Sequence, residues 1–347
     1  MKDPSITQRH GGNGAAPLLG TWVRTKGLPQ HLTAMLALAL LALALSSCNL
    51  ARMHGRAVER RLVRHGYTAH TYQADGPHFV WYRNTGKPPL LLLHGYTGTG
   101  ALQWHKTTAL LSKEFDCILP DLLSHGRSAK WDSTRSGLSL DDQAAHIITL
   151  LDSLGVRAAV PVVGNSYGGG VAARLAELHP ERIERLIIYD GLVSDYSTAL
   201  ADSIARAHGA PSMLAVMRTP TANDLRFGIR LSLYKDPPLP GFLLKQVYRE
   251  FAAPYRASQI TLLKDLMAHE STFVHKRYDW RVPVYLIWGE RDELIPNATG
   301  RAILERHALP ETHWVTIPRT GHVANIERPK AFVAVLRSFL TASPIEP

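Results

Sequence analysis

Ser166 lies in the stretch VVGNSYGGG at residues 162–170, which places four glycines around one serine. A serine hydroxyl is a weak nucleophile at neutral pH, so it must be presented clear of the backbone and beside a base. A sharp turn from a strand into a helix presents it in this way, and neighbours without a Cβ are needed because strand and helix approach closely. Gly164 and Gly168 supply those neighbours. We therefore predict that Ser166 is a nucleophile at a strand-to-helix turn, the nucleophile elbow.

The segments on either side of this turn fit that prediction. AVPVV at 159–163 is typical of a buried strand, and GGVAARLAEL at 169–178 is typical of a helix. The glycine-rich segment lacks the lysine that a phosphate-binding loop of the G-x-x-x-x-G-K-[ST] type requires. Acyl transfer to a serine is thus favoured over phosphate binding.

Similar apolar runs recur along the chain and predict the rest of the sheet. Runs without polar alternation are expected for strands covered on both faces, and they occur at 90–93, 117–119, 186–189 and 284–288. Helix-length segments separate several of them, and one such helix is expected to begin at Ser139 and end at Gly155. The turn residues 75–77 predict a hairpin before the first run. Alternating strands and helices predict a mostly parallel sheet with helices on both faces.

Residues 191–278 interrupt this alternation, because they contain several helical stretches and no clear strand run. We predict an inserted helical cap over 191–278. The α/β core is then expected to consist of residues 67–190 and 279–343.

Four further motifs follow one another in the chain, and they carry a family resemblance. They are LLLHGYTG at 91–98, DLLSHGRS at 121–128, WGERDELIP at 288–296 and GHVANIERP at 321–329. Together with the nucleophile elbow they resemble the α/β-hydrolase family, over residues 67 to about 340 of this chain. The resemblance implies an α/β-hydrolase fold. Ser124 departs from the family pattern, which commonly has glycine at that position.

The resemblance also implies roles for an acid and a base. The order Ser, acid, His is the one expected for this fold. His322 would take the proton from Ser166 and later return one to the leaving group, and Asp292 would hold the imidazole in the productive tautomer. Some members of the family carry the acid one strand earlier, which here is Asp190. Glu290 is close enough in sequence to be a further candidate.

Two backbone N–H groups are expected to stabilise the oxyanion, those of Tyr96 and Tyr167. Their side chains could instead line the acyl pocket, and the sequence does not separate the two roles. We expect His94 to shape the oxyanion loop and Asp121 and His125 to brace a turn. Trp104 and Trp131 are expected to be packing residues or pocket walls. No set of His, Asp and Glu has metal-ligand spacing, and no cofactor is expected.

Composition limits the class of protein. Hydrophobic residues make up 45% of the 347 residues and charged residues 20%, as in a folded globular protein. The formal charge of +10 is compatible with nucleic acid or an anionic membrane as partner, but no nucleic-acid recognition motif is present. The two cysteines, Cys48 and Cys117, lie in unlike contexts, which argues against a disulfide framework.

The first 47 residues resemble a targeting segment. TAMLALALLALAL at 33–45 is shorter than the roughly 20 residues that span a bilayer and fits the apolar region of a signal peptide. The following LSSC resembles the bacterial lipobox, in which the cysteine receives lipid, so Cys48 is the predicted lipidation site. An uncleaved signal anchor is the alternative. Both interpretations place the protein on a membrane of the cell envelope, facing the periplasm or the exterior, and Asn49 after Cys48 resembles a signal for the outer membrane.

Residues 48–66 form a basic linker or helix. ARMHGRAVERRLVRH at 51–65 carries five arginines, and Val58 and Leu62 are four residues apart, as on one face of a helix. The segment could lie against anionic lipid head groups. A solvated helix whose charges bind nothing is the alternative.

These features predict a lipid-anchored serine hydrolase that cleaves carboxylic esters of small or medium acyl chains. The elbow GNSYGGG also resembles that of hydrolases acting on ring-fission products, so a carbon–carbon bond hydrolase of vinylogous diketones is the alternative. HGYTG and the lipoprotein-like start look more like bacterial esterases and lipases. A binding lipoprotein that kept the fold without turnover is a third possibility, against which the presence of Ser166, Asp292 and His322 argues.

Overall fold

The structure is a computed structural model, and it describes residues 32, 34–35, 49–73, 76–130 and 139–342. Apart from residues 32, 34 and 35, the predicted signal segment lies outside these residues, and so do Cys48 and Trp131. Contacts divide the chain after Cys48, and Asn49–Pro347 forms one unit. No helix in the described ranges combines the length and apolar character needed to cross a membrane.

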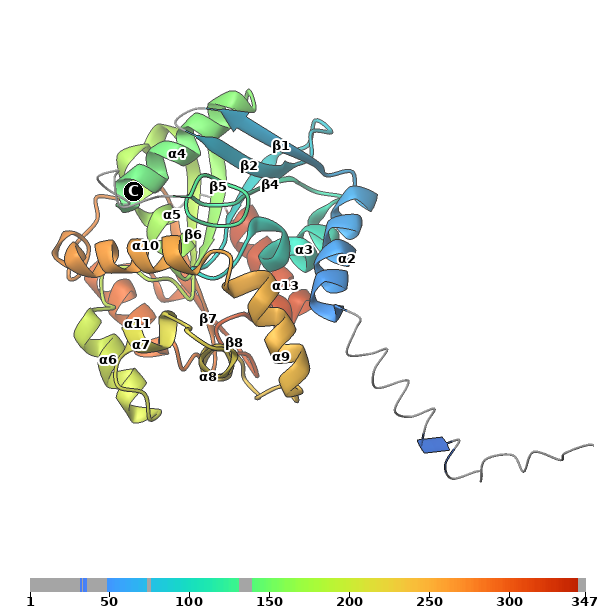
Figure 1. Cartoon of the computed structure of the whole chain (residues 1–347). Helices are drawn as coiled ribbons and strands as arrows, with labels where there is room; N and C mark the ends of the chain where they lie inside the picture. The colour runs from blue at the N-terminus through green and yellow to red at the C-terminus, as the bar shows by residue number, and fades with distance from the viewer. Residues whose placement is uncertain (1–31, 33, 36–48, 74–75, 131–138, 343–347) are drawn as a thin grey trace, which may run out of the picture. The chain divides into compact units, whose positions relative to one another are not determined.

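Eight strands in the described part of the chain form one sheet, in the order β1-β2-β4-β3-β5-β6-β7-β8 (Figure 1). Their bounds are β1 Thr68–Gln73, β2 Pro77–Tyr82, β3 Pro89–Leu93, β4 Asp116–Pro120, β5 Val160–Asn165, β6 Ile183–Tyr189, β7 Val284–Gly289 and β8 Trp314–Ile317. The hairpin of β1 and β2 is antiparallel, and β2 joins β4 in antiparallel register. All other neighbours pair in parallel.

This strand order decides where side chains can meet. Strands β3, β5, β6, β7 and β8 are consecutive neighbours and run in parallel, so their carboxyl ends lie at one edge of the sheet. Residues that follow these strands are therefore brought together even though they are up to about 230 positions apart in the chain. Ligands of open α/β sheets bind at this edge.

Helices cover both faces of the sheet because successive side chains of a strand point to opposite faces. Leu91 and Leu93 of β3 belong to one hydrophobic cluster, which includes side chains of α4, α5 and α11. Leu90 and Leu92 belong to the other, with side chains of α2, α3 and α13. The bounds are α2 Leu50–Arg64, α3 Gly100–Leu111, α4 Leu140–Ser153, α5 Tyr167–Leu178, α11 Asn297–Arg306, α12 Ala324–Glu327 and α13 Pro329–Thr341. As predicted, Ser139 caps α4 and Gly155 follows it with a φ of 73°.

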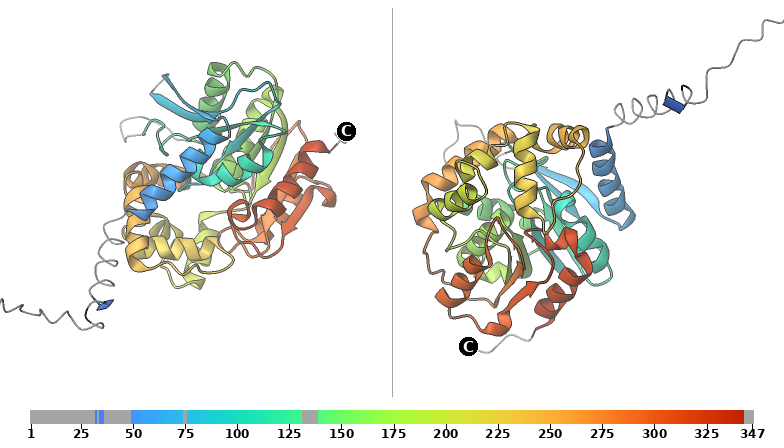
Figure 2. Two further views of the ribbon diagram at one scale, coloured as in Figure 1. Left: turned by 90° about the vertical axis from the view of Figure 1, so that its right-hand side faces the viewer. Right: turned by 90° about the horizontal axis from the view of Figure 1, so that it is seen from below.

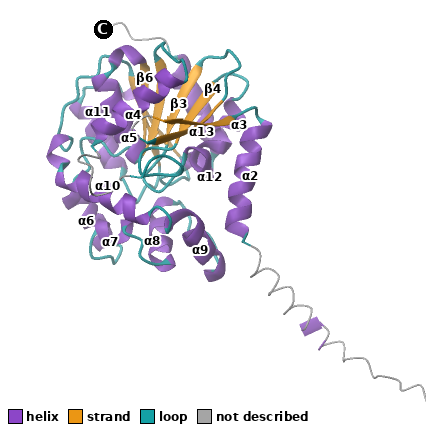
Figure 3. Cartoon of the chain, turned by 45° about the horizontal axis from the view of Figure 1, so that its top comes forward, coloured by secondary structure: helices purple, strands orange, loops and turns teal. Residues whose placement is uncertain are grey.

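Residues 191–278, all of which the structure describes, contain helices and no strand. They form α6 Thr198–Ala207, α7 Met213–Met217, α8 Ala222–Ser232, α9 Gly241–Val247, a π-helix at Tyr248–Ala252, α10 Arg256–Ala268 and a 3-10 turn at Glu270–Thr272. Further 3-10 turns occur at Pro180–Arg182 and Glu311–His313. Figure 3 shows α6 to α10 gathered together at one end of the sheet. The segment therefore returns over the edge at which the parallel strands end.

Helix α2 packs against the body through one face. Its buried residues are Ala51, Val58 and Leu62, and it contacts α3 and α9. Figure 2 shows α2, in blue, beside the yellow and orange helices, which include α9. The basic segment predicted from the sequence is thus a helix from Leu50 to Arg64.

Candidate active site

Ser166 stands at the turn between β5 and α5, as its sequence context predicted. Its backbone has φ 53° and ψ −120°, a conformation that residues with a Cβ rarely adopt. A Cβ on Gly164 would lie 2.1 Å from the carbonyl oxygen of Gly168, and a Cβ on Gly168 would lie 2.6 Å from that of His94. The two glycines are therefore required because strand, helix and the neighbouring loop are packed backbone against backbone.

His322 and Asp292 form a hydrogen-bonded pair beside this turn. The imidazole Nδ1 is 2.7 Å from the Asp292 Oδ2, and both side chains are buried. Oδ1 of Asp292 accepts the backbone N–H groups of Leu294 and Ile295, each at 2.9 Å. Because a carboxylate only accepts, the proton of the imidazole lies on Nδ1, and Nε2 is left with a lone pair that can take a proton.

The loop that carries His322 is tied to the elbow. Nδ2 of Asn165, the residue before Ser166, lies 3.3 Å from the carbonyl oxygen of His322 and 3.3 Å from that of Tyr189. Ser166 and His322 line the same cavity. The structure thus brings Ser166, His322 and Asp292 to one place from the ends of three different strands.

Asp190, the alternative acid, lies next to the same pair. Ligand atoms of Asp190, Asp292 and His322 all lie within 4.8 Å of one another. Asp190 Oδ1 accepts the N–H of Gly289 at 2.8 Å, whereas its Oδ2 has no hydrogen-bond partner among the described residues. Burial and the charge of Asp292 raise the pKa of Asp190 well above its usual range. Asp190 is therefore the carboxyl that holds a proton, while Asp292 accepts hydrogen bonds as a carboxylate.

Two carboxyl groups and an imidazole within this distance also have the composition of a cation site. Spacing in the sequence did not indicate this group, because its members follow three separate strands. In the geometry observed, Nδ1 of His322 donates to Asp292, and a nitrogen that donates has no lone pair for a metal. Glu290 does not join the group, since its exposed carboxylate accepts the N–H of Arg319.

The candidate oxyanion donors come from two elements. Tyr167 is the first residue of α5, and the first N–H groups of a helix have no acceptor within the helix. Tyr96 lies in the loop after β3, and its side chain lines both cavities next to Ser166. The Tyr96 hydroxyl donates to the carbonyl oxygen of Gln259 on α10 at 2.6 Å, and Gln259 Nε2 donates to the Tyr96 carbonyl at 3.2 Å. The Tyr96 side chain thus serves both as a pocket wall and as an attachment to the cap.

The residues expected to brace this region do so through backbone contacts. His94 Nδ1 donates to the carbonyl of Gly95 and its Nε2 accepts the N–H of Leu122, so both nitrogens are in use. Burial lowers the pKa of His94 to about 3, which keeps it neutral. Asp121 accepts the N–H groups of Gly100 and Arg127. These contacts shape the loop after β3 and leave His94 no role as a second base.

His125 and Trp104 line neither of the cavities next to Ser166. The ring nitrogens of His125 face the carbonyl oxygens of Leu123 and Tyr96. Trp104 is fully buried against the rings of Tyr189 and Phe332. Trp104 is therefore a packing residue.

Ser124 has φ 68°, the left-handed region that favours glycine. This explains why the family pattern has glycine there.

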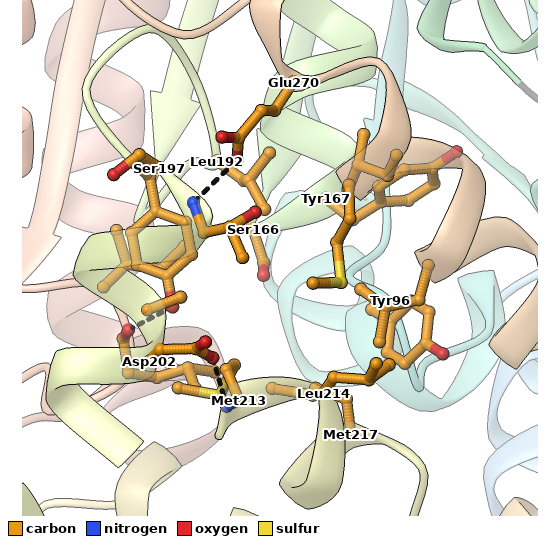
Figure 4. A pocket seen from close by; sticks show the side chains of 18 of the residues that line it. Tyr96, Ser166, Tyr167, Leu192, Ser197, Asp202, Met213, Leu214, Met217 and Glu270 are labelled. Atoms are coloured by element: carbon orange, nitrogen blue, oxygen red, sulfur yellow. Dashed lines mark hydrogen bonds between the residues drawn. The ribbon is translucent and has the colours of Figure 1, made fainter. Parts of the chain in front are cut away.

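Two apolar cavities meet at Ser166. One, with about 720 Å³ of space partly open to solvent, is shown in Figure 4 with Tyr167, Leu192 and Met213 on its walls. The other, with about 1110 Å³, extends toward α8 and includes His322. Their shared lining is Ser166, Tyr96, Met217 and Leu294. A substrate bound across Ser166 would place one group in each cavity.

The smaller cavity is lined by acidic side chains as well as apolar ones, and the larger cavity by no aspartate, glutamate, lysine or arginine of the described residues. No lysine or arginine of the described residues lines either one. Asp202 and Glu270 line the smaller cavity, where they accept the N–H groups of Met213 and Thr198. A ligand with a free carboxylate would therefore find no cation in either cavity.

A buried amide network was missed by sequence reasoning. Gln103 Nε2 lies 3.2 Å from Oδ1 of both Asn165 and Asn325, and Asn325 Nδ2 donates to the Gln103 carbonyl. The hydroxyl of Tyr189 lies 3.2 Å from Asn325 Oδ1. The presence of asparagine inside two of the motifs, GNSYG and GHVANIERP, was the available signal. The network joins α3, the elbow and the loop of His322.

Comparisons with known proteins bear on the fold and the family of this chain. A 2-hydroxy-6-oxononadienedioate/2-hydroxy-6-oxononatrienedioate hydrolase of Paraburkholderia phymatum is 29% identical over 75% of this chain and 90% of its own. Lipase 1 of Psychrobacter immobilis is 24% identical over 73% of this chain and 78% of its own. The crystal structure of a bacterial membrane phospholipase A shares the fold, with a TM-score of 0.68 and 23% identity over 90% of this chain and 98% of its own. Residues 90–335 match the model of the alpha/beta hydrolase family, and this chain therefore belongs to that family of hydrolases.

Proposed function

We propose that this protein is a serine hydrolase that cleaves carboxylic esters through an acyl-enzyme intermediate. The observation that carries the proposal is the His322–Asp292 hydrogen bond of 2.7 Å beside a serine at which two apolar cavities meet. A neutral ester has an apolar group on each side of its carbonyl carbon, which suits two such cavities.

The chemistry follows from these positions. The Ser166 hydroxyl attacks the carbonyl carbon while Nε2 of His322 takes its proton. The N–H groups of Tyr96 and Tyr167 stabilise the oxyanion that forms, since donors already held by the fold need no reorganisation. The intermediate collapses as Nε2 returns the proton to the leaving alcohol. Water then attacks the acyl-enzyme by the same steps, and Asp292 stabilises the imidazolium in each half-reaction.

Hydrolysis of carbon–carbon bonds in vinylogous diketones is the second candidate. The elbow GNSYGGG and the relative named as a dienedioate hydrolase favour it. A dioate carries two carboxylates, however, and the absence of lysine and arginine from the described lining of both cavities favours the neutral ester.

Parallel assays decide between the two reactions. One preparation of the protein is assayed with p-nitrophenyl esters of increasing acyl length and with a ring-fission dienoate. We expect turnover of the esters alone. Turnover of the dienoate with negligible ester hydrolysis would support the second candidate. A fluorophosphonate probe should label wild type and leave Ser166→Ala unlabelled. Failure to label the folded wild type would indicate a binding protein without turnover.

We also propose that the chain is held at the cell envelope through Cys48, which follows the lipobox-like LSS, or through an uncleaved apolar segment. Metabolic labelling with a radioactive fatty acid tests this, and we expect incorporation in wild type and none in Cys48→Ala. Membrane association of the unlabelled variant would support the signal anchor instead.

A further inference from the structure

Four arginines occur at every fourth position of α2, namely Arg52, Arg56, Arg60 and Arg64, called here the arginine stripe. Residues four apart are neighbours on a helix surface, and like charges at this spacing destabilise a helix. The first turn of α2 contains no acidic residue to offset them. Repulsion between these arginines weakens α2, and an anion bound to them would remove this repulsion.

The stripe faces away from the body of the protein. At 100° per residue, the stripe is centred opposite the face that holds the buried residues Ala51, Val58 and Leu62. Met53 and Val63, which are 54% and 59% exposed, lie on the same side as the stripe. The outward surface of α2 therefore combines cationic side chains with two exposed apolar ones, while the inward face fixes the helix to α3 and α9.

Three of the four arginines are free of intramolecular ion pairs. Arg52 pairs with Glu250, but no described carboxylate forms an ion pair with Arg56, Arg60 or Arg64. These three line an open groove of about 960 Å³ together with Glu59, Val63 and Trp81. Glu59 is itself paired with Arg127. The groove thus presents three guanidinium groups that form no ion pair with the described carboxylates, and the carboxylate of Glu59 in its lining is bonded to Arg127.

The position of the stripe in the chain indicates which anion meets it. The apolar run 33–45 ends five residues before Leu50, and five residues span at most about 17 Å. If that run or a lipid on Cys48 enters a bilayer, as the proposed function holds, α2 lies near the lipid head groups. Guanidinium groups bind phosphate oxygens in bidentate geometry, and basic residues near an anionic leaflet strengthen membrane binding.

We propose that the arginine stripe docks on the phosphates of anionic lipids at the surface of the membrane. Met53 and Val63 then enter the boundary between head groups and acyl chains. Because α2 is packed against α3 and α9 through its buried face, this contact fixes how the rest of the protein is oriented at the membrane.

A fluorophore on the stripe tests the contact in the full-length protein. Val63→Cys is labelled with a polarity-sensitive dye and mixed with vesicles of phosphatidylcholine alone or with one third phosphatidylglycerol. We expect a blue shift with the anionic vesicles only, reversed by high salt because exposed charges are screened. The added changes R56Q, R60Q and R64Q should abolish it. K113Q, K264Q and K330Q remove the same charge from exposed sites outside α2 and should preserve the blue shift.

Flotation and esterase activity of the same samples separate the proposals. If the protein floats with both vesicle types but shows no blue shift, docking by the arginine stripe is overturned, and the proposed membrane anchor is not. Flotation with anionic vesicles alone would support the stripe and contradict the anchor. Flotation with neither would overturn the stripe, and so would arginine-dependent binding of duplex RNA without a vesicle-dependent shift. Ester hydrolysis reports on the proposed reaction independently, since the stripe lies outside the cavities at Ser166.

Discussion

Asp292 and Asp190 both lie close to His322, but they accept different numbers of hydrogen bonds from the backbone. Asp292 accepts two backbone N–H groups and the imidazole N–H. Asp190 accepts one N–H group and faces the Asp292 charge in a fully buried position. Like charges so close cannot both persist without cost, and the proton therefore resides on Asp190.

This difference predicts unequal effects of removing each acid. Asp292→Asn should lower kcat for a p-nitrophenyl ester by about 10³-fold or more, because an amide can donate to Nδ1 and stabilise the wrong tautomer. Asp190→Asn should keep kcat within about threefold, since an amide resembles the protonated acid in shape and charge. An equal loss in Asp190→Asn would show that the acid acts from the end of β6.

Asp190 also makes stability depend on pH. Its pKa is raised in the folded state, so above the unfolded value of about 3.9 the unfolded chain releases a proton that the folded chain keeps, and stability falls as pH rises. Asp190→Asn lacks this proton. We expect the variant to melt higher than wild type at pH 8, with the difference shrinking toward pH 4. A difference in melting temperature that is the same across this range would contradict the assignment of the proton.

At the scale of elements, the approach of β5 to α5 and of α10 to the loop after β3 decides how the reacting groups are held. The elbow has no room for a Cβ at Gly164. Gln259 of the cap helix α10 forms hydrogen bonds with both the hydroxyl and the backbone carbonyl of Tyr96. Strand and helix thus meet backbone against backbone, whereas the cap is joined to the loop after β3 by hydrogen bonds from side chains to backbone carbonyls.

The elbow can be tested through stability. Gly164→Ala places a methyl group 2.1 Å from a backbone oxygen and should destabilise the fold by about 3 kcal/mol or prevent accumulation. Gly228→Ala in α8 is the control, because a Cβ there meets nothing within 4 Å and should stabilise the helix by about 1 kcal/mol. Urea unfolding measures both, and similar free energies of unfolding for the two variants would refute the steric explanation.

The contact of α10 with Tyr96 can be tested through the split between kcat and KM. Gln259→Leu removes one of the donors to the Tyr96 carbonyl, so Tyr96, whose N–H is the proposed oxyanion donor, is less firmly held. We expect kcat to fall about tenfold with KM within twofold. Thr261→Ala, a change on α10 at a half-buried residue that lines neither cavity, should alter neither kcat nor KM. A rise in KM alone would mean that Gln259 only shapes the pocket.

At the scale of the whole molecule, the cap and the core together create two cavities on either side of Ser166. The smaller draws its walls from α6, α7 and α10, and the larger from α8 and the loops after β3 and β8. Residues of both the core and the cap line each cavity, so a preference for either part of the proposed ester would be a property of their assembly.

Filling one cavity at a time should separate the two preferences. Leu263→Trp narrows the smaller cavity and Ile229→Trp the larger. Both variants are assayed with two series of esters, one that varies the acyl chain and one that varies the alcohol. Each variant should lower kcat/KM for the bulky members of one series only, and the affected series should differ between the two variants. Losses in the same series would show that both cavities receive one part of the substrate.

The sequence alone was sufficient for the fold class, which the family match and the structural relatives confirm. It was sufficient because strand burial, helix caps and the glycines of the elbow follow from local sterics and periodicity. The same local rules led to Ser166, His322 and Asp292 as candidates, although their catalytic roles stay predictions.

Tertiary structure alone decided which of these side chains meet. The closeness of Asp190 to His322, the amide network of Gln103, Asn165 and Asn325, and the bonds from Gln259 to Tyr96 join residues tens to hundreds of positions apart. Spacing along the chain carries no measure of such distances, because strand order, register and the return of the cap over the sheet set them. The cavities that would select a substrate arise from the same long-range packing.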